Sequence, residues 1–261
     1  MCGLIAVKNV PKAIELAVVG AHVLQHRART YAGAASCDGQ HFYHHAGKGL
    51  ARQVFSDGWL DRLHGKDALV HLRYPTVGDA KDRDNAQPIR GIYDSREFYL
   101  GHNGNITNKS ELNNLLPPGM QLSTALDTEY IVRLIEQYQT GDIEADLKKV
   151  FSYLKGSFSL VVLMTNRLIA VRDKSGNRPL SVGRLEDGYC VASETCAFPI
   201  MQARHIHDVE PGTMTIVDEH GLHVKRFASA RENKCVFELH YNSNPVSREF
   251  GVGATRFRQG V

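Results

Sequence analysis

The sequence has few of the features that mark secreted, membrane or nucleic-acid-binding proteins. It contains only five cysteines, an odd number with no Cys-x-x-Cys pair, which argues against a disulfide framework and a zinc site. Its longest aliphatic run, Leu160 to Met164, is far shorter than the ~18 residues of a membrane-spanning segment. The N-terminus lacks the charged-then-apolar pattern of a signal peptide. A soluble, cytoplasmic protein that binds no membrane is therefore expected.

The sequence also has no large excess of positive or negative charge. The formal net charge is +3, from 31 Lys and Arg against 28 Asp and Glu, and the basic residues are scattered along the chain. Proteins that bind nucleic acid usually concentrate basic residues on one face, so such a partner is not indicated. No internal repeat and no linker rich in Gly, Ser or Pro occurs before residue 230. The 261 residues are enough for one large hydrophobic core.

The apolar residues follow an order of strands, then helices, then strands. Helical spacing of apolar residues occurs over residues 11–27, around 131–138 and over 143–154. Strand-like runs occur at residues 1–7, 31–37, 40–46, 67–73, 98–100, 158–164, 168–171, 181–182, 189–192 and 214–217. This order predicts an α+β fold in which helices are layered on antiparallel sheets.

Cys2 stands directly behind Met1 and opens an apolar run. If Met1 is removed, Cys2 carries both a thiol, with a pKa near ~8.5, and a free α-amine, with a pKa near ~7.7–8.0. The amine can then accept the proton of the thiol, which is a recognised way to activate a nucleophile. The alternative from position alone is a small, buried and unreactive cysteine.

Three polar features of the sequence have a simple structural interpretation. Asn103-Gly104 is a strong signal for a hairpin turn, but a helix start at residues 108–111 leaves no place for a partner strand. Asp127 lies in the first turn or at the cap of the 131–138 helix, and on local grounds the cap is favoured. The polar segment 74–84 is typical of a mobile loop.

Eight motifs resemble, in order and spacing, those of class II glutamine amidotransferases, and in particular the glutaminase domain of amidophosphoribosyltransferases. The motifs are Cys2-Gly3-Leu4-Ile5, Leu24-Gln25-His26-Arg27, His71 to Gly78, Asn85-Ala86-Gln87-Pro88, His102-Asn103-Gly104-Asn105, Leu126-Asp127-Thr128-Glu129, Arg172-Asp173 with Arg178-Pro179-Leu180, and Ala192-Ser193-Glu194. No single motif is decisive, but eight in register over residues 2–245 make coincidence a poor explanation.

The resemblance implies a four-layer αββα N-terminal-nucleophile fold, with two antiparallel sheets between helical layers. It implies hydrolysis of L-glutamine to glutamate and ammonia through a thioester on Cys2, with no cofactor and no metal. The implied partner is a protein subunit that accepts the ammonia. The resemblance leaves open whether the chain also forms a homo-oligomer.

Carried over residue by residue, the resemblance makes Cys2 the nucleophile, and Asn103 with the backbone N–H of Gly104 the oxyanion hole. These roles make chemical sense, because attack on an amide places negative charge on its oxygen. Each hydrogen-bond donor arranged in advance around that oxygen can contribute ~10²–10³ in rate.

The resemblance also implies a set of residues that bind glutamine. Arg73 is expected to bind the carboxylate, since its planar guanidinium matches a carboxylate with two hydrogen bonds. Asp127 is expected to pair with the α-ammonium group, and Thr76 and His102 are further expected substrate-binding residues. Segment 74–84 resembles the glutamine loop of the family, which closes over the substrate and excludes water.

Two features match the family pattern poorly. Ala28-Arg29-Thr30 replaces the usual Gly-Gln-acidic continuation, which leaves the role of Arg27 open. Two clusters of histidines, His41/His44/His45 and His205/His207, match no family site. They are expected to lie on strand surfaces rather than bind metal.

The resemblance divides the chain into a glutaminase domain, residues 2–232, and a segment of residues 233–261 that resembles the start of a phosphoribosyltransferase domain. The latter is interpreted as a remnant or docking tail. Three functions are open: a glutaminase that passes ammonia to a separate acceptor subunit, a non-catalytic glutamine-binding or scaffolding subunit, and the glutaminase subunit of a glutamate-synthase-like complex. The intact set of site residues favours the first and third, because a scaffold has no need of the thiol.

Overall fold

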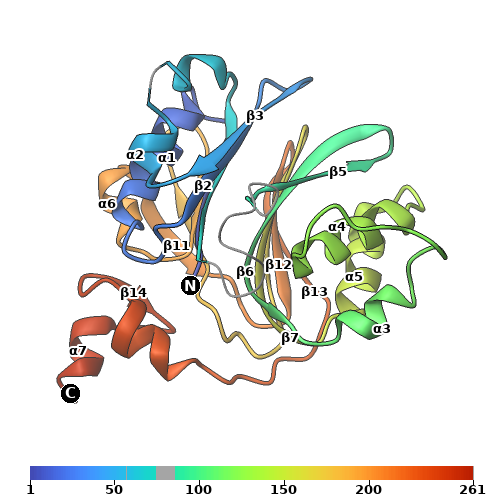
Figure 1. The fold of residues 1–261 in the computed structure, drawn as a ribbon. Coiled ribbons are helices and arrows are strands. Elements are labelled where there is room, and N and C mark those ends of the chain that lie inside the picture. The colour runs from blue at the N-terminus through green and yellow to red at the C-terminus, as the bar shows by residue number, and fades with distance from the viewer. Residues whose placement is uncertain (57, 75–85, 261) are drawn as a thin grey trace.

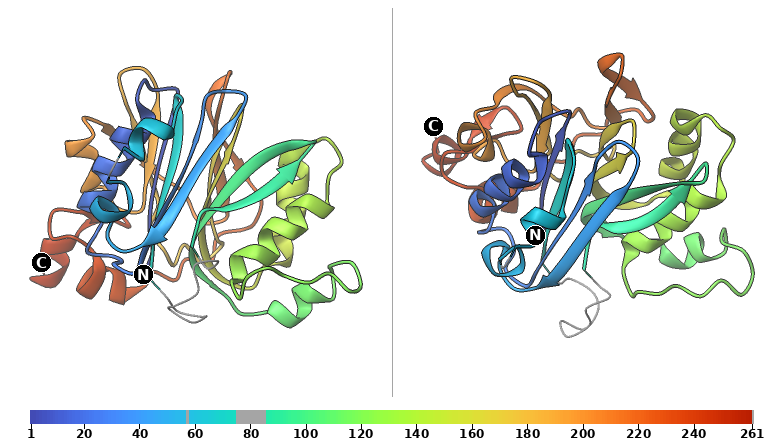
Figure 2. Two further views of the ribbon diagram at one scale, coloured as in Figure 1. Left: turned by 45° about the horizontal axis from the view of Figure 1, so that its top comes forward. Right: turned by 90° about the horizontal axis from the view of Figure 1, so that it is seen from above.

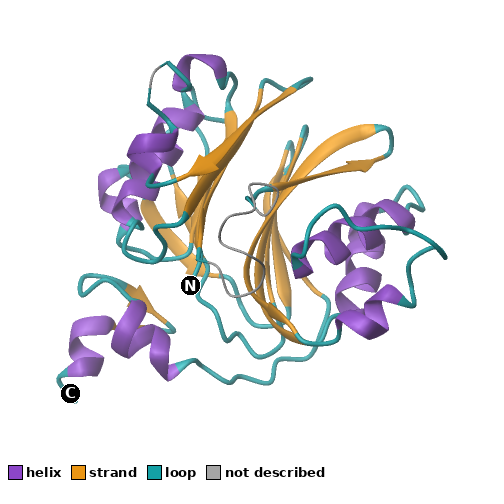
Figure 3. Cartoon of the chain, viewed as in Figure 1, coloured by secondary structure: helices purple, strands orange, loops and turns teal. Residues whose placement is uncertain are grey.

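Two antiparallel sheets stacked face to face form the centre of the protein. The computed structural model describes residues 1–56, 58–74 and 86–260. Helices cover the outer face of each sheet, so the layers run helix, sheet, sheet, helix (Figures 1 and 3). This arrangement confirms the expected α+β class and its four-layer αββα architecture.

The first sheet has seven strands in the order β11-β9-β10-β1-β4-β2-β3. They are β1 (Gly3–Lys8), β2 (Tyr31–Cys37), β3 (Phe42–Lys48), β4 (Asp67–Arg73), β9 (Ser181–Arg184), β10 (Tyr189–Ala192) and β11 (Arg204–Asp208). β1 lies between β10 and β4, and all six of its residues are buried. Burial on both faces explains why the sequence of β1 is continuously apolar rather than alternating. Cys2 therefore stands at the beginning of a central strand.

The second sheet has six strands in the order β13-β12-β8-β7-β6-β5. They are β5 (Ile89–Tyr93), β6 (Arg96–Ile106), β7 (Gly156–Met164), β8 (Leu168–Arg172), β12 (Thr213–Asp218) and β13 (Gly221–Arg226). β6 pairs with β5 only as far as Leu100, whereas its pairing with β7 continues to Ile106. Asn103-Gly104 thus lies inside a strand, and the hairpin-turn interpretation is wrong.

Each sheet has its own helical layer. The first sheet is covered by α1 (Ala13–Val23), α2 (Ala51–Val54) and α6 (Ala197–Ile200) (Figure 1). The second sheet is covered by α3 (Lys109–Asn113), α4 (Asp127–Gln137) and α5 (Ile143–Tyr153). A short 3₁₀ turn occupies Leu60–Arg62. α1 begins two residues after Pro11, later than the sequence pattern predicts, because Lys12 has a φ of 55° and cannot continue a right-handed helix. No helix in the described part of the chain is long and apolar enough to cross a membrane.

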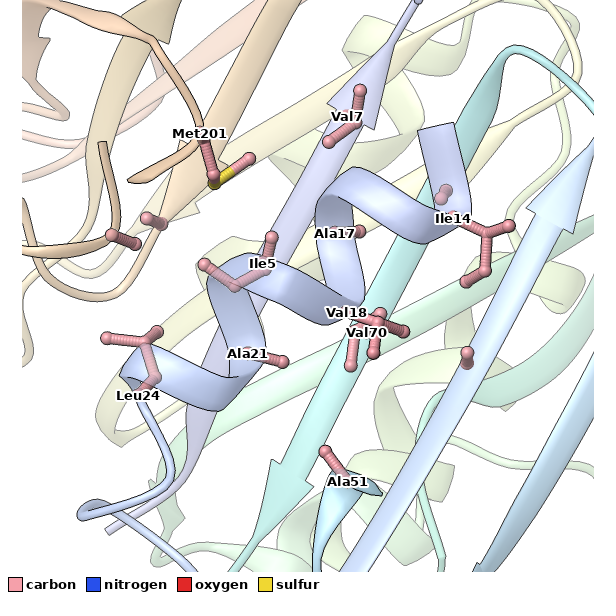
Figure 4. Packing of buried hydrophobic residues seen from close by; sticks show 14 of the residues in the cluster. Ile5, Val7, Ile14, Ala17, Val18, Ala21, Leu24, Ala51, Val70 and Met201 are labelled. Carbon is pink, nitrogen blue, oxygen red and sulfur yellow. The ribbon is translucent and has the colours of Figure 1, made fainter. Parts of the chain in front are cut away.

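The helices bury their apolar faces against the sheets. Ile14, Val18 and Ala21 of α1 pack in a cluster that includes Ile5 of β1 and Val70 of β4 (Figure 4). A third apolar cluster fills the space between the two sheets. These contacts fix the sheets relative to each other, and the site described below depends on that alignment.

The C-terminal segment packs beside the helical layer of the first sheet (Figure 2). It contains the helical turn η3 (Glu238–Asn242), the two-stranded ribbon of β14 (Arg248–Glu249) and β15 (Val252–Gly253), and α7 (Ala254–Arg258). Leu239 and Ala254 are buried, whereas Phe237 and Tyr241 are exposed. The segment therefore has one face against the rest of the protein and one apolar face towards solvent.

Candidate functional site

Cys2 and Asn103 meet where the beginning of β1 faces β6 of the other sheet. The backbone N–H of Cys2 donates a hydrogen bond of 3.2 Å to Oδ1 of Asn103. A Cβ placed on Gly101 would contact Leu4, which shows that this face of β6 points towards the first sheet. Side chains two residues apart on a strand share a face, so Asn103 points the same way.

The amide nitrogen of Asn103 is buried without a partner. Its Nδ2 makes no hydrogen bond with the described residues, and the side chain is 1% exposed. Leaving a buried donor unsatisfied costs ~1–3 kcal/mol, so such groups are rare and call for an explanation. Oδ1 of the same side chain accepts from Cys2, so the nitrogen without a partner lies beside the cysteine.

Beyond Leu100, one edge of β6 pairs with no strand among the described residues, and this edge carries a second donor. Beyond the end of β5, the N–H of His102 donates to Gln87 and the N–H of Ile106 donates to Asp127. Gly104 lies midway between these two residues, and alternate residues of a strand direct their N–H groups to the same side. The N–H of Gly104 therefore points to the same open edge.

The neighbouring strand supports this direction for the Gly104 N–H. Phe158 lies opposite Gly104 in β7, but its N–H and C=O both bond to Asp173 on the far side. Gly104 and Phe158 are therefore a pair without mutual hydrogen bonds. A Cβ on Gly104 would lie 2.0 Å from the carbonyl oxygen of Ser157, so glycine is needed for the two strands to approach.

Asp127 is the first residue of α4, but it does not cap that helix. The N-cap position belongs to Leu126, which has no side-chain cap bond. Oδ2 of Asp127 instead accepts the Ile106 N–H at 2.8 Å, and Oδ1 lies 3.6 Å from Nδ1 of His102. The capping interpretation is therefore wrong, and the carboxylate joins α4 to β6.

Asp127 and His102 each shift the pKa of the other towards the charged form. Burial raises the pKa of Asp127, but the charge of His102 and the Ile106 N–H outweigh it and lower that pKa to about 2. Burial likewise lowers the pKa of His102, but the charge of Asp127 gives it a net rise. His102 also lies 3.2 Å from the hydroxyl of Thr128, so its side chain faces α4, on the side of β6 opposite Asn103.

Arg73 lies beside Cys2 in the first sheet. Gly3 pairs with Leu72 in the antiparallel ladder of β1 and β4, so Arg73 is the next position along, opposite Cys2. The residue is 2% exposed, and its guanidinium carbon lies 5.7 Å from the ring centre of Tyr31. Thr76 and most of the expected glutamine loop fall within residues 75–85, outside the described residues, so these assignments remain predictions.

Arg27 holds the backbone of Cys2 and is part of a buried ion network. Its Nε donates to the carbonyl of Cys2 at 2.8 Å, its Nη1 to Glu194 at 2.6 Å and its Nη2 to Glu238 at 3.0 Å. Burial lowers the pKa of Arg27, but Glu238 and Glu194 outweigh it and give a net rise. Nε2 of His26 also lies 2.8 Å from Glu194. Arg27 thus connects the cysteine to the C-terminal segment.

Sequence reasoning did not find this network. Glu194 lies in one of the matched motifs but received no role, Glu238 was placed in a tail, and the role of Arg27 was left open. A buried arginine requires carboxylate partners, but the polar residues around Arg27 give no sign that it is buried. The sequence does not say which carboxylates these are.

The histidine clusters lie apart from this site. His44 and His45 are on β3 and His205 and His207 on β11, the two edge strands of the first sheet, as expected. His41 does not fit the expectation, because it lies just before β3 begins. Among the described residues no group of three or more His, Cys, Asp or Glu is arranged to hold a metal ion.

Known proteins are similar to this chain in sequence. A family described as "Glutamine amidotransferase domain" matches residues 71–199. The amidophosphoribosyltransferase of Bacillus subtilis is 34% identical over 100% of this chain, which covers 55% of that protein. That of Archaeoglobus fulgidus is 35% identical over 99% of this chain, which covers 57% of it. The chain therefore spans about half the length of the curated relatives it matches.

Solved structures agree with the sequence comparison. The glutamine phosphoribosylpyrophosphate amidotransferase of B. subtilis, described as complexed with ADP and GMP, matches with a TM-score of 0.91 and 34% identity. The match covers 97% of this chain and 55% of that one. A glutamine aminotransferase class-II domain protein from Silicibacter pomeroyi, at 15% identity and a TM-score of 0.57, shares the fold.

Proposed function

The chain belongs to the glutamine amidotransferases and resembles the glutaminase half of amidophosphoribosyltransferases, and from this we propose that it hydrolyses glutamine to glutamate and ammonia through a thioester on Cys2. One observation carries the proposal. The buried amide nitrogen of Asn103 has no partner among the described residues, and the same side chain is bonded to Cys2. A donor in this position suits a negative oxygen formed during attack by Cys2.

The reaction needs one nucleophile, one base and two oxyanion donors. The thiol of Cys2 passes its proton to its own α-amine, and the sulfur attacks the side-chain carbonyl carbon of glutamine. Asn103 and the N–H of Gly104 stabilise the oxyanion. As the intermediate collapses, the C–N bond breaks and the amine returns the proton to the leaving nitrogen, which departs as ammonia. Water then cleaves the thioester, releasing glutamate and restoring the thiol.

Glutamine is recognised through both charges of its backbone. Arg73, next to Cys2 in the ladder register, binds the carboxylate. Asp127 binds the α-ammonium group and stays ionised because His102 and the Ile106 N–H lower its pKa to about 2. His102 accordingly acts through Asp127 rather than by touching the substrate. Thr76 and segment 74–84 complete the binding site in this proposal.

The α-amine of Cys2 becomes available only when the residue before it is removed. The amine of Met1 lies 3.4 Å from the carbonyl of Arg27, in a half-buried position, and burial lowers its pKa. Once Met1 is gone, the amine of Cys2 remains next to Oδ1 of Asn103. Mass measurement of the purified protein should show a chain that begins at Cys2, and full activity with Met1 retained would contradict the mechanism.

The ammonia passes to an acceptor protein. We assign residues 2–232 to the glutaminase domain and residues 233–261 to a docking tail, and the exposed Phe237 and Tyr241 support this assignment. The intact set of Cys2, Asn103 and Arg73 speaks against a non-catalytic scaffold. The alternative, a glutamate-synthase-like complex, differs from this proposal only in the protein that accepts the ammonia. Purification of the protein with its native partner would distinguish the two functions.

The deciding experiment is directed at the thiol. Cys2→Ala should abolish ammonia release from glutamine, and the glutamine mimic diazo-oxo-norleucine should label the wild-type protein at Cys2 alone. Cys235→Ala is the matched control, since Cys235 is the other partly exposed cysteine among the described residues. Labelling at Cys235, or hydrolysis that survives Cys2→Ala, would refute the proposal.

A further inference from the structure

A cavity opens beside the C-terminal end of α1, next to Arg27, which holds the carbonyl of Cys2. Its volume is about 470 Å³, within the ~300–1,000 Å³ typical of small-molecule sites. It is lined by His22, Gln25, His26, Arg29, Leu50 and Arg52. The proposed glutaminase reaction does not use this cavity.

The lining is basic and contains no carboxylate. Arg29 and Arg52 are exposed, and neither forms a hydrogen bond or ion pair with another described residue. Two arginines that share a cavity and lack a counter-charge repel each other and attract an anion. Burial and the charge of Arg52 both lower the pKa of His22, which is consistent with a positive local potential.

Several backbone acceptors near the cavity are already occupied. A helix C-terminus presents carbonyl groups that disfavour an anion, but here three carbonyls of the last turn of α1 are bonded to donors. The carbonyl oxygens of Gly20, His22, Val23 and Ala28 accept from Leu24 N, Gln25 N, His26 Nδ1 and Gln25 Nε2, respectively. The guanidinium donors of Arg29 and Arg52 are available, since neither side chain has a hydrogen-bond partner among the described residues.

We propose that this cavity binds a small anion bearing a phosphate group. Arg29 and Arg52 would supply charge-assisted hydrogen bonds to the phosphate, because a guanidinium matches its oxygens two at a time. The volume exceeds what one phosphate fills, and Leu50 offers apolar contact for the group that carries it. A phosphate monoester with a compact apolar part is therefore the expected ligand class.

The ligand would act on the glutaminase site through one short segment. Arg29 lies two residues after Arg27, whose Nε holds the carbonyl of Cys2. His26, also in the cavity wall, contacts Glu194, which in turn bonds Arg27. Occupancy would therefore change the kinetics of glutamine hydrolysis, and this consequence, unlike the binding itself, rests on the proposed function.

Binding is tested by calorimetry with phenyl phosphate and, separately, inorganic phosphate as probes. Wild-type protein should bind phenyl phosphate, and Arg29→Gln and Arg52→Gln should each weaken binding about tenfold or more, because each removes a charge-assisted contact. The double variant should not bind. Arg204→Gln, on the edge strand β11, is the control for loss of an exposed arginine, and equal thermal stability of all variants excludes misfolding.

Each outcome bears on the proposal. Tighter binding of phenyl phosphate identifies an ester as the ligand, and equal binding of inorganic phosphate identifies free phosphate. Failure of wild type to bind either probe, or loss that is equal in Arg204→Gln, overturns the proposal. A change in the KM for glutamine that disappears in the double variant supports the coupling, and an unchanged KM overturns the coupling alone. Absence of all glutaminase activity refutes the proposed function and leaves the calorimetric result intact.

Discussion

The side chain of Asn103 divides two tasks between its two polar atoms. Its oxygen accepts from the backbone of Cys2, and its nitrogen stays without a partner among the described residues. The first contact fixes the amide in one orientation, so the second group is arranged before the substrate arrives. Such prior arrangement is what makes a donor effective in a transition state, because no reorganisation is then needed during the reaction.

This division predicts a separation of kinetic effects. Asn103→Ala should lower kcat by ~10²–10³ with little change in KM, since the donor acts on charge that develops in the reaction. Arg73→Ala and Asp127→Ala should mainly raise KM, because the groups they bind do not change charge. Steady-state ammonia release measures both. A severalfold rise in KM with unchanged kcat in Asn103→Ala would show that the oxyanion assignment is wrong.

Glu249 is a buried carboxyl group beside the Arg27 network. Burial and then the negative charge of Glu194 raise its pKa to about 8, although Arg27 opposes the shift. The folded protein therefore keeps a proton on Glu249 that the unfolded chain, with an ordinary glutamate pKa of ~4.3, has lost. Between about pH 4.5 and 8 the folded state binds more protons, so Glu249 makes the protein less stable as pH rises.

Glu249→Gln tests this pH dependence. The amide cannot ionise, so the variant should lose less stability than wild type between pH 5 and 8, and the difference should grow by up to ~1.4 kcal/mol per pH unit. Above pH 8 the two curves should run parallel. Urea unfolding at a series of pH values gives both curves, and parallel curves throughout pH 5–8 would mean that Glu249 is already ionised in the folded protein.

At the scale of elements, β6 shows what the sequence could and could not predict. The apolar run 98–100 and the absence of a partner strand after Asn103-Gly104 argued correctly against a hairpin turn. β6 continues beyond the end of β5 because the two strands differ in length. The local pattern of apolar residues does not encode this difference. The open edge, and with it the direction of the Gly104 N–H, could therefore be seen only in the folded protein.

The same limit applies to long-range ionic contacts. The fold class, the three long helices and the strand that begins after Cys2 followed from apolar spacing and from the resemblance. The short helices α2, α6 and α7 were not predicted. The partners of Arg27 lie 167 and 211 residues away in the chain. Asp127 likewise satisfies a strand N–H rather than its own helix, because the tertiary contact takes precedence over the local preference.

η3 is the element that joins the C-terminal segment to the site. The side chain of Glu238 is fully buried and accepts from both Arg27 and Arg178. Glu238→Gln leaves Arg27 with one fewer counter-charge and should destabilise the protein by ~3–5 kcal/mol, as expected when a buried ion pair is broken. Because Arg27 holds the carbonyl of Cys2, kcat should fall as well.

The control for Glu238 is an exposed ion pair of similar length. Glu210→Gln breaks a 2.7 Å contact with Arg226 on the surface, where such pairs contribute ~0–1 kcal/mol. Chemical denaturation and steady-state kinetics should separate the two variants clearly. Equal effects would mean that the C-terminal segment is attached without influence on the site.

At the scale of the whole molecule, the site exists only because the layers are aligned. Cys2 and Arg73 come from the first sheet, Asn103 and Gly104 from the second, and Asp127 from the helical layer beyond it. No single layer contains both the proposed nucleophile and the proposed oxyanion donors. Any partner that shifts one layer relative to another would therefore alter catalysis.

The C-terminal segment is placed to transmit such an effect. Phe237 and Tyr241 are 65% and 78% exposed, and their rings stack at 5.5 Å. Glu238, in the same turn of chain, points inward to Arg27. An acceptor protein that covers the two aromatic rings would therefore press on η3. Glu238 of η3 contacts Arg27, and Arg27 in turn holds the carbonyl of Cys2. Exposed aromatic pairs of this kind are common centres of protein interfaces.

The isolated chain should accordingly be a slow glutaminase that the acceptor activates. Ammonia released without an acceptor is wasted, so full assembly of the site is expected only in the complex. Phe237→Ser and Tyr241→Ser should leave the basal rate unchanged and abolish activation by the co-purified acceptor. Ile200→Ser, which alters an exposed apolar residue on α6, should retain activation. If the isolated chain already turns over ~10 times per second and the acceptor does not change that rate, the site needs no partner for its assembly, and the coupling through η3 must be abandoned.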